Sequence, residues 1–143
     1  MEDEQSSKLL FLFLCSMNRT AAFEAFNLAL AVSLGALGAH FLKEHLDPSS
    51  MISFQTGVRY HIYHSLSLLV FAGFPLYQEL KKPVILMSIG MLLFSVSIYL
   101  LSTRGLLFSE SSLKWLGPIT PVGGLCLIVA WLWIGISMLI SKK

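Results

Sequence analysis

Four long apolar runs, separated by short polar or proline-containing stretches, set the pattern of this sequence. They cover residues 21–42, 56–77, 84–103 and 121–140. A helix needs about 20 predominantly apolar residues to cross the hydrocarbon core of a bilayer, and all four runs are long enough. The pattern therefore predicts an all-α, polytopic membrane protein, with four transmembrane helices in a small bundle within residues 17–143.

Residues 1–16 differ from the rest and form an atypical N-terminal extension. Their acidic start is unlike the positive first region of a signal peptide, and the apolar stretch at 9–15 is too short to span a bilayer. Arg19 follows Met17 closely and places a positive charge just before the first run. We therefore hypothesise that translation begins at Met17, which the intact mass of the native protein checks.

The second run carries the richest side-chain chemistry of the four. On a helical wheel, one arc of about 100° holds most of its polar residues, with Arg59 beside the arc and His61 on its far edge. The members of the arc are Thr56, Tyr60, Tyr63, His64 and Ser67. Because unpartnered polar groups are costly in hydrocarbon, we expect this arc to face the neighbouring helices.

Small residues mark the expected contacts between helices, because they allow two helix backbones to approach closely. We expect Gly35 and Gly38 in the first run, and Gly123 and Gly124 in the fourth, to pack against neighbours. In the third run a small polar residue recurs every seven positions, a spacing that fits a left-handed helix–helix contact. These residues are Ser88, Ser95 and Ser102.

Several residues are interpreted as signals of helix ends. Thr120 followed by Pro121 predicts the N-cap and the first helical position of the fourth helix. Residues 78–83 predict a short charged turn after the second helix. Glu24 lies about one turn inside the first run, where it favours the positive helix N-terminus. Deeper burial of this carboxyl group would make it a candidate proton or cation site.

Composition supports a membrane protein. Hydrophobic residues make up 55% of the 143 residues and charged residues only 13%, against about 25% charged in a typical soluble domain. The net charge of +2 and the lack of a basic run with aromatic residues predict no binding to nucleic acid. The expected partners are the lipid bilayer and either further copies of the chain or another membrane protein.

Cys15 and Cys126 both lie in apolar runs, which indicates packing rather than redox or metal chemistry.

The positions of lysine and arginine near the helix ends predict the orientation. With both termini in the cytoplasm, the cytoplasmic side carries Lys8, Arg19, Lys81, Lys82, Lys142 and Lys143. The other side then carries the smaller set of Lys43, Arg59, Arg104 and Lys114. The bias favours cytoplasmic termini, in the cell membrane or in a bacterial inner membrane. This topology brings His40, Thr56, Arg104 and Thr120 to one membrane side, so we expect a polar cluster in the non-cytoplasmic half.

Several short motifs resemble those of one family of small membrane proteins. The first is Gly35-Ala36-Leu37-Gly38-Ala39-His40, which is similar to a GAxGAH signature. The others follow in the family's order: Gln55-Thr56-Gly57, Tyr60, His64, Phe94-Ser95, Ser97, Tyr99, Thr120-Pro121-Val122-Gly123-Gly124 and Ala130-Trp131. The family is catalogued as domain of unknown function 423, and its eukaryotic relatives are named transmembrane protein 256. The resemblance covers the chain from about Phe23 onward and implies four helices, with no established activity.

Together the motifs and the polar pattern define a candidate polar cluster or ligand-binding site. Its members are His40, Gln55, Thr56, Arg59, Tyr60, His64, Ser95, Tyr99 and Thr120. The first hypothesis is structural: these side chains form hydrogen bonds between helices in a structural or assembly component of the membrane. The alternative is a transport site for a small solute, an anion or protons, formed in an oligomer by His40, Arg59 and His64, since histidine titrates near neutral pH.

A metal or haem site on His40, His61 and His64 is a third hypothesis, because helix bundles hold such groups between facing helices. His61 and His64 point in different directions, however, and neither a cysteine nor a pair of carboxylates assists them. No GxSxG, HExxH or glycine-rich phosphate loop occurs in the sequence. We therefore expect no catalytic residues, no metal and no cofactor, and the chain is not predicted to be an enzyme.

Overall fold

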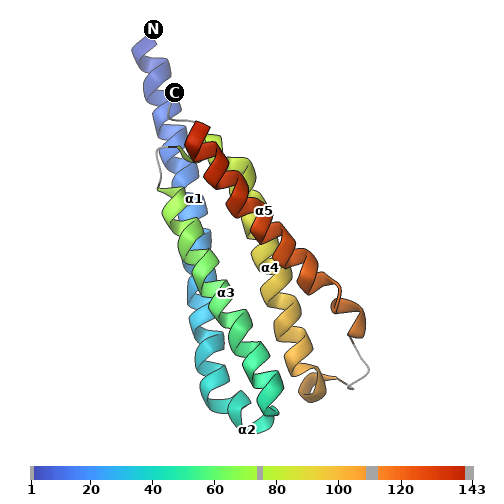
Figure 1. Ribbon diagram of the computed structural model, residues 1–143. Helices are drawn as coiled ribbons and strands as arrows, with labels where there is room; N and C mark the ends of the chain where they lie inside the picture. The colour runs from blue at the N-terminus through green and yellow to red at the C-terminus, as the bar shows by residue number, and fades with distance from the viewer. Residues whose placement is uncertain (1, 74–75, 109–112, 141–143) are drawn as a thin grey trace.

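The computed structural model describes residues 2–73, 76–108 and 113–140, apart from the side chains of residues 2, 3, 6, 8–18 and 114. Four long helices run through this part of the chain (Figure 1). They are α1 (Glu2–Leu37), α3 (Pro48–Ala72), α4 (Tyr77–Leu107) and α5 (Ile119–Ile140). The predicted all-α fold is therefore confirmed.

Short helical segments join the long helices. The end of α1 continues into one π-helical segment, η1 (Gly38–Leu42), and then into α2 (Lys43–His45). A single 3₁₀ turn, η2 (Lys114–Leu116), precedes α5. A π-helical segment takes more residues per turn than an α-helix and is often found near functional sites.

Each long helix packs against the next one along the chain: α1 against α3, α3 against α4 and α4 against α5. Figure 1 shows α1 and α3 side by side, with α5 lying along α4. The first turns of α1 extend past the other helices, at the same end of the bundle as the last turn of α5. The chain is therefore a row of antiparallel helices that begins and finishes at one end.

Three stretches of the described chain are long and apolar enough to cross a membrane: Arg19–His45, Tyr77–Leu107 and Ile119–Ile140. Helix α3 is not among them, because its arginine, histidines and serines lower its mean hydropathy. Length and composition thus support several spans, and three of the four predicted ones are apolar enough to qualify.

The turn predicted at 78–83 is wrong. These residues form the first turns of α4, which begins at Tyr77 and contains Pro83 in its interior. The polypeptide reverses direction before this point, because α3 ends at Ala72 with Gly73 as its C-cap. A proline inside a helix removes one backbone hydrogen bond, and the burial of the Pro83 ring in the bundle offsets part of that loss.

Two apolar clusters form the core. The larger one lies between α3, α4 and α5 and includes Leu68, Leu80, Met87, Met91 and Leu127. The smaller one lies at the opposite end, where Phe54 and Val58 of α3 meet Leu42 of η1. Glycines permit the closest approaches, since a Cβ atom on Gly38 would lie 3.0 Å from the Phe54 ring. Side chains between the two clusters are more polar, and they form the candidate site.

Candidate functional site

His64 connects α3 to α5 through both nitrogen atoms of its ring. Its Nδ1 lies 2.7 Å from the carbonyl oxygen of Tyr60, which can only accept, so Nδ1 carries the proton. Its Nε2 then accepts a hydrogen bond from the indole Nε1–H of Trp131, at 3.3 Å. These partners assign a neutral imidazole with a defined tautomer, and they leave neither nitrogen free for a metal or a substrate.

His61 connects α3 to α4. Its side chain is 2% exposed, and its Nδ1 lies 3.2 Å from the hydroxyl oxygen of Tyr99. The other nitrogen, Nε2, is buried and has no hydrogen-bond partner among the described residues. The expectation that His61 lies at the far edge of the inward arc is wrong, because this residue is among the most buried polar groups of the chain.

The inward face of α3 is rotated relative to the predicted arc. Tyr60 and Tyr63 were expected to face inward, but their side chains are 41% and 60% exposed. The buried face instead passes through Val58, His61 and Ser65. Helix α3 packs against both α1 and α4, and these two neighbours decide which of its faces is buried. A helical wheel of α3 alone does not show where the neighbours lie.

Thr120 connects α4 to α5 in place of capping a helix. Its Oγ1 lies 2.7 Å from the hydroxyl oxygen of Ser97. The predicted N-cap role is wrong, because α5 already begins at Ile119. Ser97 also donates to the carbonyl oxygen of Phe94 in its own helix, so the Thr120 hydroxyl is the donor in the bond between the helices.

Further polar contacts complete the connections between helices. Ser65 of α3 donates to the sulfur atom of Met91 in α4, at 3.3 Å. Thr20 of α1 and Tyr77 of α4 share a hydrogen bond at 3.1 Å between their hydroxyl oxygens. All four long helices therefore take part in hydrogen bonds between side chains.

The serines spaced seven residues apart in α4 behave differently from one another. Ser88 and Ser102 each donate to the carbonyl oxygen four residues earlier in their own helix. Ser95 is buried, and its hydroxyl oxygen has no partner among the described residues. The bond between the helices comes from Ser97, which lies outside this seven-residue spacing.

The remaining predicted site residues lie on the surface of the bundle. His40, Gln55 and Arg59 are exposed, and Thr56 is partly buried. Arg59 donates to the hydroxyl oxygen of Thr56, at 3.3 Å, within the same helix. The three residues of the transport alternative are therefore not gathered in one buried site, because His40 and Arg59 are exposed while His64 bonds to α5.

Glu24 is buried inside the bundle, with 1% of its side chain exposed. The interpretation of this residue as a helix N-terminal carboxylate is wrong, because α1 begins at Glu2, many residues earlier. The side chain of Asn27 is a hydrogen-bond partner of the carboxyl group, while Oε2 has no partner among the described residues. An acidic residue followed three positions later by an asparagine, within an apolar helix, is the sequence signal that predicts this pair.

A polar cavity lies where α3 begins and α4 finishes. It has a volume of about 420 Å³ and is lined by Arg104, Thr120 and several serines: Ser49, Ser50, Ser53 and Ser102. A second cavity of about 450 Å³ shares Ser49, Ser50, Ser102 and Arg104 with the first and adds His45 and Asp47. The two cavities adjoin at these shared residues and are together called the Arg104 cavity below.

Asp47 holds the start of α3 in place. As the N-cap residue it accepts hydrogen bonds from the backbone N–H groups of Ser49 and Ser50, at 2.9 and 3.1 Å. Hydrogen bonds from Ser50 and Ser49 keep the pKa of this carboxyl group well below its ordinary value. Asp47 therefore carries a negative charge at neutral pH, on the wall of the Arg104 cavity. The cap before Pro48 follows from the sequence, but the nearness of Arg104 does not.

Comparison with known proteins identifies the family to which this chain is similar. The model of the family described as "Protein of unknown function (DUF423)" matches residues 34–124. The UPF0382 membrane protein YwdK of Bacillus subtilis is 38% identical over 119 residues, covering 79% of this chain and 89% of that protein. No solved structure matches the chain significantly.

Two further relatives come from distant organisms. The UPF0382 membrane protein C1782.12c of Schizosaccharomyces pombe is 36% identical over 105 residues, covering 71% of this chain and 86% of that protein. A UPF0382 membrane protein of Haemophilus influenzae is 31% identical over 115 residues, covering 78% of this chain and 86% of that protein. The resemblance found in the sequence motifs is therefore confirmed, and this membrane protein belongs to the DUF423 family, whose function is unknown.

Proposed function

We propose that this chain is a four-span structural or assembly component of its membrane. Helix α3 has 25 residues, which at 1.5 Å per residue gives about 37 Å, enough to cross a hydrocarbon core of about 30 Å. Its lower hydropathy is compatible with a span because the buried polar groups of this helix face other helices. The proposed role requires no catalysis and no cofactor.

The hydrogen bonding of His64 is the observation that carries this proposal. A neutral imidazole with both nitrogens bonded to protein groups stabilises the packing of α3 against α5, and it has no atom left for chemistry. The bonds of Ser97 with Thr120 and of His61 with Tyr99 act in the same way on the other helix pairs. Buried hydrogen bonds of this kind favour one helix register over its alternatives.

The proposed orientation has both termini in the cytoplasm. An even number of spans requires both ends of the chain on one side, and the N-terminal turns of α1 lie at the same end of the bundle as the end of α5 (Figure 1). Lys81 and Lys82 belong to this end as well, in the second turn of α4. The excess of positive residues there supports the cytoplasmic assignment.

The hydrogen bond between α4 and α5 should contribute measurably to stability. We expect Ser97→Ala and Thr120→Val each to lower the free energy of unfolding, with the double variant losing less than the sum. The expected coupling is about 0.6 kcal/mol and no more than about 1.7 kcal/mol, the range for hydrogen bonds between membrane helices. A double-mutant cycle on the protein unfolded in mixed micelles measures it.

The matched control for this cycle is the pair Ser33 and Ser53. Both hydroxyl groups bond only to carbonyl oxygens of their own helices, so the Ser33→Ala and Ser53→Ala effects should add. A coupling of zero between Ser97 and Thr120, equal to that of the control pair, would contradict the proposed network.

An assembly role predicts that a second copy of the chain covers the exposed side of α3. This side presents Gln55, Arg59 and Tyr63 to the outside of the bundle, and an arginine facing lipid costs about 2.5–3.5 kcal/mol at mid-membrane depth. We expect native mass spectrometry in mild detergent to detect dimers or larger assemblies. The Tyr63→Ala variant should shift them toward monomers, by about tenfold in the association constant.

Leu132 provides the comparison for this experiment. It is similarly exposed but lies on α5, so Leu132→Ala should leave the stoichiometry unchanged. A monomer at every protein concentration, in the wild type as in the variants, would refute self-assembly through this face.

A further inference from the structure

The Arg104 cavity holds two opposite charges that do not pair with each other. Arg104 and Asp47 both line it, yet no ion pair joins them within the described residues. The hydrogen bonds that cap α3 converge on Oδ1 of Asp47, and the Asp47 side chain is exposed, so a ligand can reach its carboxylate group. The cavity therefore offers a cation and a carboxylate group to a ligand within a single space.

This set of groups is complementary to a ligand that carries both charges. The guanidinium group of Arg104 suits the oxygens of a phosphate group. A carboxylate oxygen suits a primary ammonium group, which donates hydrogen bonds, better than a quaternary ammonium group, which has no N–H to donate. A purely anionic headgroup would place a negative charge near Asp47 without compensation. Phosphoethanolamine has the matching pair of charges.

An apolar groove begins beside the same cavity. It has a volume of about 450 Å³ and lies between the end of α1, η1 and the last turns of α4, with Phe41, Leu42, Phe54 and Leu100 among its lining residues. Leu106 lines both this groove and the Arg104 cavity. A volume in this range suits an apolar ligand. The combined site is thus polar at one end and apolar at the other, as an amphiphilic ligand requires.

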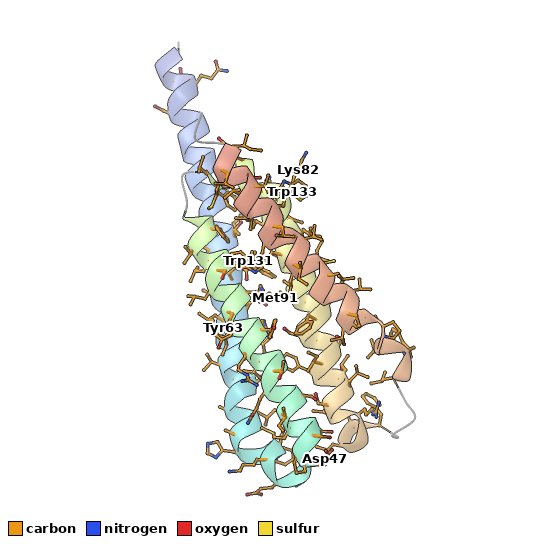
Figure 2. The ribbon with its side chains drawn as sticks, in the orientation of Figure 1. Asp47, Tyr63, Lys82, Met91, Trp131 and Trp133 are labelled. Carbon is orange, nitrogen blue, oxygen red and sulfur yellow. The ribbon has the colours of Figure 1, made fainter. Side chains whose placement is uncertain are left out.

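The combined site also lies at the depth expected for lipid headgroups. Arg104 is in the last turn of α4, one of the membrane-spanning stretches. Figure 2 shows Asp47 at the end of the bundle away from Lys82 and Trp133. The exposed Trp115 side chain belongs to the connection between α4 and α5, and tryptophan is enriched where hydrocarbon meets water.

We propose that the Arg104 cavity and the adjoining groove bind one phospholipid of the ethanolamine class from the surrounding bilayer. Arg104 holds its phosphate group, Asp47 accepts from its ammonium group, and the apolar groove takes an acyl chain. Of the candidate polar cluster, Thr120 and Tyr99 line this site. The site is distinct from the hydrogen bonds of His64, while Tyr99, the partner of His61, lines the apolar groove.

Native mass spectrometry of the full-length, delipidated protein tests this proposal. Ethanolamine, choline and glycerol phospholipids with identical acyl chains are titrated separately, and one-lipid complexes are counted. We expect the ethanolamine lipid to bind at least about tenfold more tightly than the other two, the value of one hydrogen bond to a charged group. Asp47→Asn should remove this preference, since asparagine still caps the helix. Arg104→Gln should weaken all three lipids by about tenfold.

Arg19→Gln is the matched control, because Arg19 is exposed in α1 and lies outside the cavity and the groove. It should leave the affinity for each lipid unchanged. Equal affinity for the three lipids, or no effect of Asp47→Asn and Arg104→Gln, would show general bilayer contact and overturn the proposal. Binding of inorganic phosphate at the same concentrations, with displacement of the lipid, would also overturn it by identifying a site for a free solute.

Discussion

Gly123→Ala is expected to lower the free energy of unfolding by about 3 kcal/mol, at the upper end of the range for overpacked contacts. A Cβ atom at this position would lie 2.5 Å from the backbone nitrogen of Phe94 and 2.9 Å from its Cα. These are backbone atoms of α4, so no side-chain rotation relieves the clash. The two helices would have to move apart, and contacts along their whole interface would weaken. Unfolding followed by circular dichroism in mixed micelles measures the loss.

Gly124→Ala is the control for this experiment. A Cβ atom there would meet the Phe94 ring at 3.6 Å, an ordinary contact distance, while the change in helix propensity is the same. The difference between the two variants therefore isolates the clash. Gly135→Ala extends the comparison, because no atom lies within 4 Å of its added Cβ. Equal stability of Gly123→Ala and Gly124→Ala would mean that α4 and α5 are not packed as closely as described.

Phe54→Ala is the second variant with a large expected effect, again about 3 kcal/mol. The Phe54 side chain is 2% exposed, packs against the ring of Tyr99 with centroids 5.1 Å apart, and lies directly against Gly38. In a membrane the unfolded helices still face lipid, so the loss arises from missing contacts and the cavity rather than from transfer to water. Thermal unfolding in detergent micelles reports it as a lower midpoint.

Phe26→Ala removes the same number of atoms from α1 at a side chain that is 76% exposed. Its expected cost is less than about 0.5 kcal/mol, typical of a surface position. If both variants lost the same stability, Phe54 would not be a core residue, and the packing of α3 against η1 and α4 would need revision.

The elements of the fold follow closely from the apolar runs. All four predicted runs correspond to long helices, because length and hydropathy are local properties of the chain. The helix ends were less predictable. Pro83 was interpreted as the end of a turn, but it lies inside α4, where the burial of its ring compensates for the lost hydrogen bond. Thr120 was interpreted as a cap, but its hydroxyl group bonds to Ser97 of another helix.

The candidate site was predictable in its residue types and less so in its geometry. His64, Tyr99 and Thr120 were expected to take part in bonds between helices, and the structure supplies partners for each of them. The partner of His64 is Trp131, a residue 67 positions away, and no local pattern pairs the two. His61 was placed at an edge, although contact with α4 buries it beside Tyr99.

Sequence was thus sufficient for the helical membrane class, the family and the list of polar residues, since each depends on composition, local periodicity or short motifs. Only the tertiary structure decided which side of α3 is buried, that Glu24 lies inside the bundle, and that Arg104 and Asp47 share one cavity. These features depend on how helices distant in sequence are rotated against each other. The rotation of each helix depends on contacts at several interfaces at once. It therefore cannot be predicted from the sequence of any single segment.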